Sequence, residues 1–303
     1  MTVVAVLVGL ALLAGLGIWL ALQHNPHRVL DTVDRVVGPG SDVERVHAAD
    51  LGDDPRQKLF VYRDGERREG QPVFLFLHGG GWRHGDPEHY AFIARSIAPE
   101  GYIVVLGGYR LGEQGRYPAM LEDTSAAIAW THANIARFGG DPQRILLGGH
   151  SAGAYNVVQT VLEARWLVDK GVPRTAIRGV VGLAGPYDFF PFDTDSSRST
   201  FGSVDAGPQS QPVNHAHGDA PPMLLVHGET DTVVRPRNSR ALAGALGEVG
   251  AEVETLYLPE ADHNAPLLAL ANPWRRDPKV RDRILEFLGE AGSVSVSVQA
   301  ENP

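Results

Sequence analysis

The chain has 303 residues, 43% of them hydrophobic and 21% charged, which is typical of a globular protein with a sizeable core. Its 27 Lys and Arg residues against 36 Asp and Glu residues give a net charge of −9 without any basic block, so nucleic-acid binding is not expected. The absence of cysteine excludes disulfides, thiol nucleophiles and cysteine zinc sites.

The N-terminal segment is strongly apolar. Val3 to Leu22 carry no charge, and in a helix of about 1.5 Å per residue they would cross a bilayer core of roughly 30 Å. We expect residues 1–22 to be a single-pass anchor in a cell membrane. The sequence does not decide on which side of the membrane the rest of the chain lies. A cleaved signal peptide, giving a secreted or periplasmic protein, and a soluble helix are the alternatives. The signal peptide is less favoured because no Lys or Arg precedes the run and no A-x-A-like site follows it.

The central part of the chain alternates short apolar runs with longer helical stretches. Residues 23–42 are predicted to be a linker, and residues 43–290 a catalytic domain of α/β class. The runs predicted as strands are 59–62, 73–77, 103–106, 145–147, 180–183, 223–226 and 253–258. The stretches predicted as helices are 118–138, 152–168, 238–249 and 279–288. This alternation predicts a mostly parallel central sheet with helices on both faces.

Two segments break the alternation. Residues 185–220 are rich in Phe, Pro, Ser and Asp without a clear period, and such long connections are often lids or binding loops. We expect a short insert there. The small, polar tail over residues 291–303 is predicted to be disordered.

The sequence GHSAG at residues 149–153 follows a predicted strand and precedes a predicted helix. This is the G-x-S-x-G pattern in its strand, tight turn and helix setting, in which the turn exposes the serine and the two glycines let strand and helix pass closely. Ser151 is therefore the expected nucleophile. A packing serine at a helix N-terminus is the structural alternative.

A serine hydroxyl needs a base, and the base needs an orienting acid. In folds of this type the acid follows the serine on a loop beyond a later strand. HGETD at residues 227–231 follows the strand at 223–226, which makes Asp231 the expected acid. Glu229, two residues closer to the strand, is the alternative.

The base is expected after the following strand. His263 alone comes after both the acid and the strand at 253–258. His215 and His217 lie in the irregular connection, and His227 belongs to the end of its strand. His263 is therefore the predicted general base.

The sequence HGGGW at residues 78–82 follows the apolar strand at 73–77. Acyl transfer places negative charge on a carbonyl oxygen, and preorganised backbone N–H groups stabilise that charge. We expect Gly80, Gly81 and Ala152 to supply these groups, with glycine needed because side chains would block the oxygen. Phosphate-loop patterns are absent, since no Lys follows Gly85.

Aromatic residues near these motifs are candidates for the substrate pocket. They are Trp82, which follows the glycines, and Phe189 and Phe190 in the irregular connection. His84, His89 and Asp86 lack the spacing of a metal site, so no metal is expected.

Taken together, HGGGW at 78–82, YRL at 109–111, FGGDPQRI at 138–145, GHSAGA at 149–154 and HGETD at 227–231 resemble the α/β-hydrolase carboxylesterases. Within that group the chain is most similar to branches akin to hormone-sensitive lipase, to bacterial feruloyl and acetyl esterases, and to prenylcysteine methylesterases. The resemblance covers about residues 59–290. It implies the α/β-hydrolase fold, with Ser151, Asp231 and His263 as catalytic triad and Gly80, Gly81 and Ala152 as oxyanion hole.

The sequence thus predicts a membrane-anchored serine esterase that needs no cofactor and acts on a small-molecule ester through an acyl-enzyme. Short acyl chains are expected because no large helical cap precedes the first strand. Two alternatives remain: the same machinery acting on an amide, as in arylformamidases or peptidases, and a non-catalytic binding protein with the hydrolase fold. The oligomeric state is not predicted.

Overall fold

The computed structural model describes residues 26–38, 42–202, 207–274 and 278–293. The predicted anchor over residues 1–22 and the tail beyond Ser293 lie outside these ranges. No helix within the described ranges combines the length and apolarity that a membrane crossing requires.

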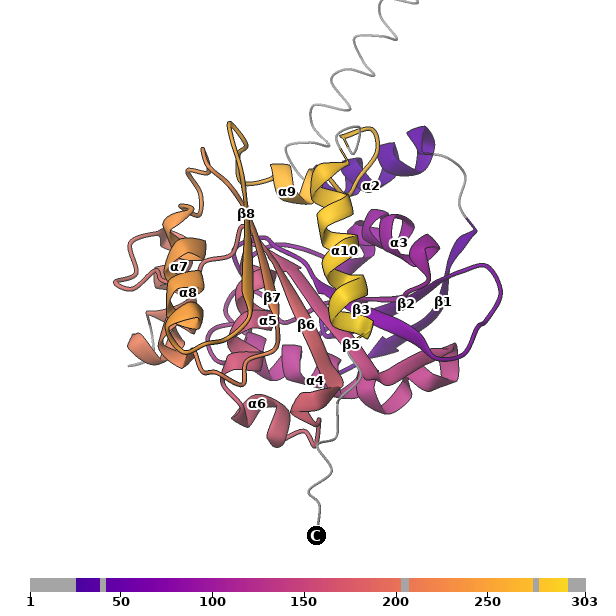
Figure 1. Cartoon of the computed structure of the whole chain (residues 1–303), viewed down its shortest axis with the longest axis horizontal. Helices are drawn as coiled ribbons and strands as arrows, with labels where there is room; N and C mark the ends of the chain where they lie inside the picture. Colours follow the sequence, from indigo (N-terminus) through magenta and orange to yellow (C-terminus); the bar gives the residue numbers. More distant parts are fainter. Residues whose placement is uncertain (1–25, 39–41, 203–206, 275–277, 294–303) are drawn as a thin grey trace, which may run out of the picture.

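Eight strands of the described chain form one sheet, in the order β1-β2-β4-β3-β5-β6-β7-β8 (Figure 1). They are β1 (Val43–Asp50), β2 (Lys58–Asp64), β3 (Gln71–Leu77), β4 (Ile103–Gly107), β5 (Gly140–His150), β6 (Ile177–Leu183), β7 (Met223–Gly228) and β8 (Val253–Leu258). Strand β2 runs antiparallel to β1 and β4, and every other neighbouring pair is parallel. The predicted strands and the mostly parallel sheet are confirmed. Strand β1 was not predicted because its sequence, VERVHAAD, lacks an apolar run. The structure gives the reason: no residue of this edge strand is fully buried.

The helices fill the connections between these strands. They are α2 (Pro26–Val37), α3 (Ala91–Ile97), α4 (Ala119–Asn134), α5 (Ala152–Leu162), α6 (Arg165–Val168), α7 (Asp195–Phe201), α8 (Arg237–Glu248), α9 (Ala265–Leu268) and α10 (Lys279–Ser293). Short 3₁₀ turns lie at Pro87–Tyr90, Ala98–Glu100, Ile135–Phe138, Arg174–Ala176, Pro208–Ser210 and Pro212–His215. The four predicted helical stretches are present, although the first ends in a 3₁₀ turn and the second is divided into α5 and α6. Helix α10 extends past residue 290, so residues 291–293 are helical and not part of a disordered tail.

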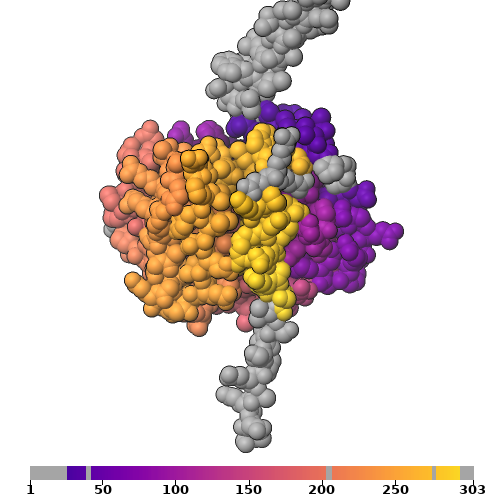
Figure 2. All heavy atoms as spheres, turned by 45° about the horizontal axis from the view of Figure 1, so that its top comes forward, coloured from indigo at the N-terminus to yellow at the C-terminus, as the bar shows by residue number. Residues whose placement is uncertain are grey.

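Alternate residues of the strands enter two separate cores. In β3, Val73, Leu75 and Leu77 pack with residues of α4, α5 and α8, whereas Phe74 and Phe76 pack with residues of α2, α3 and α10. Helix α10 crosses in front of the sheet in Figure 1, with α4 and α5 behind it. In Figure 2 it lies on the surface between the orange and purple parts of the chain. The predicted helices on both faces are therefore confirmed.

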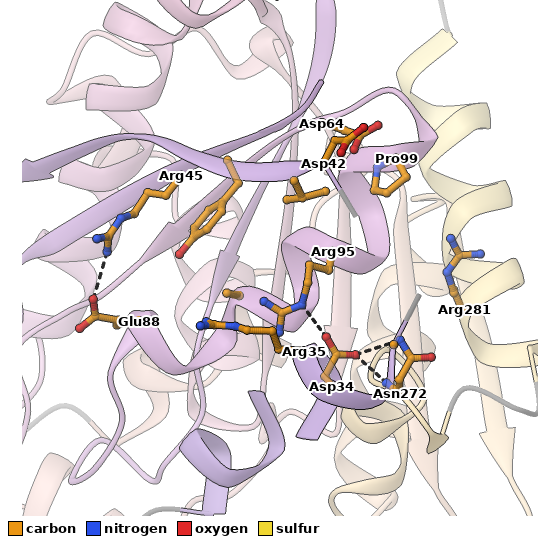
Figure 3. Close-up of a pocket in the computed structure, with 14 residues that line it drawn as sticks. Asp34, Arg35, Asp42, Arg45, Asp64, Glu88, Arg95, Pro99, Asn272 and Arg281 are labelled. Atoms are coloured by element: carbon orange, nitrogen blue, oxygen red, sulfur yellow. Dashed lines mark hydrogen bonds and ion pairs between the residues drawn. The ribbon is translucent and has the colours of Figure 1, made fainter. Parts of the chain in front are cut away.

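Residues 26–37 correct the prediction of a linker over residues 23–42. They form α2, which is fastened to the catalytic domain by Asp34 (Figure 3). One oxygen of this buried carboxylate accepts a 2.6 Å hydrogen bond from Arg95 Nε, and the other accepts a 2.7 Å bond from the backbone N–H of Asn272. Asp31 accepts a second bond from Arg95. The sequence of this segment resembles a linker because the residues that hold it, Arg95 and Asn272, lie far away along the chain.

A cavity of about 960 Å³ lies beside α2 (Figure 3). Two ion pairs join charged residues of its lining, Arg45 with Glu88 at 3.0 Å and Arg95 with Asp34 at 2.6 Å. It contains none of the predicted catalytic residues.

The insert over residues 185–220 is more regular than its sequence predicts, because it contains α7 and two 3₁₀ turns. Thr194 begins α7 with a capping box, accepting from the N–H of Ser197 while the Ser197 hydroxyl accepts from the N–H of Thr194. Phe201 at the end of α7 is fully buried against Trp82 and Tyr155. The insert is therefore packed onto the domain around the end of β5.

Candidate active site

Ser151 stands at the turn between β5 and α5 in a rare backbone conformation, with φ 53° and ψ −118°. Its N–H donates to the carbonyl of Leu183 at 2.8 Å, which fixes the turn against the end of β6. A Cβ atom on Gly149 would lie 2.4 Å from Gly153, and one on Gly153 would lie 2.2 Å from the carbonyl oxygen of Leu77. Both glycines are therefore required for the close passage of strand and helix, as the sequence predicts. Positive φ in a serine is strained and is typical of functional sites.

Asp231 and His263 come together beyond the ends of β7 and β8. Asp231 Oδ2 lies 2.7 Å from His263 Nδ1, and the Asp231 side chain is fully buried. Glu229, the alternative acid, turns away and forms an ion pair with Arg240 at 2.6 Å. The carboxylate that contacts His263 is thus the one expected from the chain order.

Hydrogen bonds determine the charge of Asp231. Burial alone raises the pKa of this carboxyl, but the hydrogen bonds from His227 and then His263 outweigh it and hold the pKa well below its ordinary value. Asp231 is therefore an anion at neutral pH, able to orient the His263 ring and to stabilise its protonated form.

His150, the residue before Ser151, contacts His263. The His150 ring lies 4.9 Å from the His263 ring, centroid to centroid, and its Nε2 is 3.0 Å from the His263 carbonyl oxygen. Burial, together with the proximity of His263, lowers the pKa of His150 to about 3, so its ring is neutral. In the described chain the Ser151 hydroxyl itself makes no hydrogen bond.

The glycine loop after β3 passes beside the serine. Gly80 has φ 117° and its carbonyl accepts from the N–H groups of Arg83 and His84, so a Cβ atom there would lie 2.0 Å from the His84 carbonyl oxygen. A Cβ atom on Gly79 would lie 2.8 Å from His150 Nδ1. At Gly80 the tight turn itself therefore already requires glycine.

Gly81 and Ala152 border one cavity of about 290 Å³ together with Ser151, whereas Gly80 borders a different cavity. Ala152 is the first residue of α5, so its N–H has no partner within the helix. The Gly81 N–H likewise has no hydrogen-bond partner in the described part of the chain. Both amides are thus available near Ser151.

The three aromatic pocket candidates have different positions. Trp82 and Phe189 line the Ser151 cavity, and their rings stack at a centroid distance of 6.1 Å. Trp82 is nevertheless anchored as well, because its indole N–H donates to Asn156 Oδ1 at 3.0 Å. Phe190 does not line this cavity; its side chain is 48% exposed and packs on Phe192.

Several residues of this cavity were not predicted from the sequence. Thr194, Ser196 and Ser197 contribute hydroxyl groups from the start of α7, and Val233 and Val234 contribute apolar side chains from the loop after Asp231. No local pattern singles out the serines, since they reach the site only through the packing of the insert.

Ser196 makes a particular contact with the glycine loop. Its hydroxyl donates to the Gly81 carbonyl at 2.5 Å. The insert therefore helps to fix the orientation of the Gly81 peptide.

No group of three or more His, Asp or Glu side chains within the described ranges has the arrangement of a metal site. The chemistry of the cavity rests on its hydroxyl, imidazole, carboxylate and backbone amide groups.

A sheet with one antiparallel strand near its edge, a strained serine between β5 and α5, and an acid and a histidine after β7 and β8 define an α/β-hydrolase. The family model BD-FAE matches residues 59–246, and the chain belongs to this family.

Curated relatives include esterase LipC of Mycobacterium tuberculosis, 32% identical over 239 residues that cover 72% of this chain and 59% of that protein. The isoprenylcysteine alpha-carbonyl methylesterase ICME of Arabidopsis thaliana is 30% identical over 245 residues, covering 74% of this chain and 57% of that protein. The chain thus spans about three-fifths of the length of these relatives.

Solved structures share the fold. Esterase B from Lactobacillus rhamnosis superposes with a TM-score of 0.75 at 21% identity, covering 93% of this chain and 95% of that one. A truncated carbohydrate esterase from gut microbiota superposes with a TM-score of 0.72 at 20% identity, covering 85% of this chain and all of that one.

Proposed function

We propose that this protein is a serine hydrolase that cleaves carboxylic esters. The single observation that carries the proposal is that the strained Ser151 lines one small cavity with Gly81 and Ala152, while the His263–Asp231 pair is tied by the His263 carbonyl to His150, the residue before the serine. The esterase names of its relatives in the same family agree with this reaction.

In the proposed mechanism His263 takes the proton of the Ser151 hydroxyl as the serine attacks the ester carbonyl. Asp231, held as an anion, orients the ring through Nδ1 and leaves Nε2 to accept the proton. The Ser151–His263 hydrogen bond forms in the substrate complex, as catalytic contacts often tighten only then. The tetrahedral intermediate then collapses with breakage of the ester C–O bond, and protonated His263 gives its proton to the departing alcohol, which leaves the acyl-enzyme. His263 next takes a proton from a water molecule that attacks the acyl carbonyl, and breakage of the bond to Ser151 releases the carboxylic acid as the proton returns to the serine.

The amides of Gly81 and Ala152 are proposed to stabilise the oxyanion of both tetrahedral intermediates, and Gly80 to shape the turn that presents them. Loss of one such donor typically lowers the rate by about 10² to 10³. Trp82 and Phe189 provide apolar walls beside the serine. The small cavity supports a preference for short acyl chains.

The decisive experiment is labelling of the full chain with a fluorophosphonate probe, alongside hydrolysis of nitrophenyl acetate. The wild-type protein should be labelled at Ser151 and be active, and Ser151→Ala should lose both properties by at least about 10³-fold. Wild-type activity in Ser151→Ala would contradict the proposed function.

We also propose that residues 3–22 anchor the enzyme in a membrane, on the basis of their uncharged apolar sequence. The protein should stay with membranes after an alkaline carbonate wash. A variant carrying Leu12→Arg and Leu13→Arg should be released, because each central Arg costs about 3 kcal/mol of insertion free energy. Release of the wild-type protein by the wash would exclude a spanning anchor.

A further inference from the structure

A second histidine contacts the Asp231 carboxylate. His227 is the fifth residue of β7 and is fully buried. Its Nε2 lies 2.8 Å from the Val234 carbonyl oxygen and 3.2 Å from Asp231 Oδ2, and its Nδ1 lies 2.7 Å from Ser239 Oγ. Both neighbours of Nε2 are acceptors, so Nε2 carries a proton and donates it to them.

Both carboxylate oxygens of Asp231 accept hydrogen bonds, and these bonds hold the carboxylate group in one orientation. Its Oδ1 accepts from the backbone N–H groups of Val233 and Val234 at 2.8 and 2.9 Å. Its Oδ2 is shared by two imidazoles, His263 at 2.7 Å and His227 at 3.2 Å. The Oδ2 atom that orients His263 is therefore itself held by His227.

His227 also fixes the loop that carries the acid. Its bond to the Val234 carbonyl joins the end of β7 to the far side of the turn containing Asp231. Ser239, fully buried in α8, supports the ring from the opposite side through Nδ1. When the Ser239 hydroxyl donates a hydrogen bond to Nδ1, the ring proton is on Nε2. This tautomer can donate to the Asp231 carboxylate.

We propose that His227 is a positioning residue for the catalytic acid, holding Asp231 Oδ2 in line with His263 Nδ1, and that Ser239 holds the ring in the tautomer that does so. The proposal rests on the proposed ester hydrolysis by Ser151, Asp231 and His263. It differs from the simpler role of a buried histidine that only fills the core, because it requires the Nε2 proton and not merely the ring.

Two variants at residue 227 separate these roles. His227→Phe keeps a planar ring and removes the donor, whereas His227→Gln places an amide N–H close to the position of Nε2. We expect His227→Phe to lower kcat about 10- to 100-fold with KM changed less than about 3-fold, the size of effect seen when a partner that orients a functional histidine is lost. His227→Gln should restore kcat to within about 5-fold of wild type. The rate of fluorophosphonate labelling at Ser151 should follow kcat, because the Ser151 oxygen must be activated in the same way to attack phosphorus and displace fluoride.

Ser239→Ala provides a test that leaves the histidine in place. We expect it to lower kcat by about 3- to 10-fold through loss of the preferred tautomer. Its matched control is Ser125→Ala, which removes a hydroxyl equally buried in α4 and bonded only to the Glu122 carbonyl. The control should retain wild-type kcat.

Thermal unfolding identifies variants that fold. If His227→Phe does not fold, His227→Gln and Ser239→Ala still decide the outcome. Wild-type kcat and labelling rate in every folded variant would overturn the proposal, as would equal losses in the Phe and Gln variants. These results leave the proposed function intact as long as Ser151→Ala is inactive, whereas an active Ser151→Ala would overturn the proposed function itself.

Discussion

His150 Nε2 donates a hydrogen bond to the backbone carbonyl of His263, 3.0 Å away. The residue that precedes the serine therefore holds the loop that carries the histidine, although 113 positions separate them in the sequence. This contact joins the end of β5 to the loop after β8.

The first prediction concerns the acid. Asp231→Asn should lower kcat by about 10³ to 10⁴, because the amide no longer selects the His263 tautomer with the proton on Nδ1. Glu229→Gln is the control, since Glu229 pairs with Arg240 and not with His263. Steady-state kinetics of both variants on nitrophenyl acetate provide the measurement. A larger loss in Glu229→Gln than in Asp231→Asn would reverse the assignment of the acid.

The second prediction concerns the glycine loop. Gly81→Ala should lower kcat by at least about 10²-fold with a smaller change in KM, because the added methyl lies 2.9 Å from Ser196 Oγ and displaces the amide beside the serine. Gly65→Ala is a matched control, with φ 57° against 59° for Gly81 and no atom within 4 Å of the added Cβ. It bears the same backbone strain without crowding. Equal kinetic losses in both variants would argue against a special role for the Gly81 amide.

The third prediction concerns stability in acid. Burial lowers the pKa of His78 and of His27 to about 4 and that of His150 to about 3, from an ordinary value of 6.5. Between pH 6.5 and 4 the unfolded chain therefore binds protons that the folded chain excludes. The free energy of unfolding should fall as pH falls through this window, by up to about 1.4 kcal/mol per pH unit for each histidine.

Urea denaturation at several pH values measures this dependence. His78→Gln removes one of the three groups, so the slope between pH 6 and 4.5 should be shallower in that variant than in wild type. Stability that is constant or increases as the pH is lowered would contradict the prediction. Asp231, whose pKa is depressed, adds a loss in the same direction but only below about pH 4.

The fourth prediction concerns α2. Asp34→Ala should lower the free energy of unfolding by about 3 kcal/mol, because it leaves the largely buried Arg95 without one of its two carboxylates and frees α2 from Asn272. Arg35→Ala removes an ion pair whose arginine is 70% exposed and should change stability by less than about 0.5 kcal/mol. Thermal or urea unfolding compares the two. Equal stabilities would show that α2 is not an integral part of the domain.

The fifth prediction concerns the substrate. A cavity of about 290 Å³ bordered by Trp82 and Phe189 should favour short acyl groups. Across nitrophenyl esters from acetate to decanoate, kcat/KM should be highest at two to four carbons, about the length such a cavity holds. A maximum at decanoate would refute this preference.

The sequence by itself determined seven strands, four helical stretches and the residues of the G-x-S-x-G turn. Continuous apolar runs identify buried parallel strands, and the G-x-S-x-G pattern is a local motif, although the atom that a side chain at Gly153 would strike belongs to Leu77 of β3. The prediction of His263 needed only chain order, and the structure places this residue beside Asp231.

The tertiary structure alone decided the features that depend on distant partners. Strand β1 has no apolar run, and α2 resembles a linker until Asp34 meets Arg95, 61 residues away. His227 is only four residues from Asp231, but only the fold of the loop after β7 shows that the two side chains meet. Such pairings are set by the packing of elements against one sheet, and local sequence does not encode which buried polar groups will meet there.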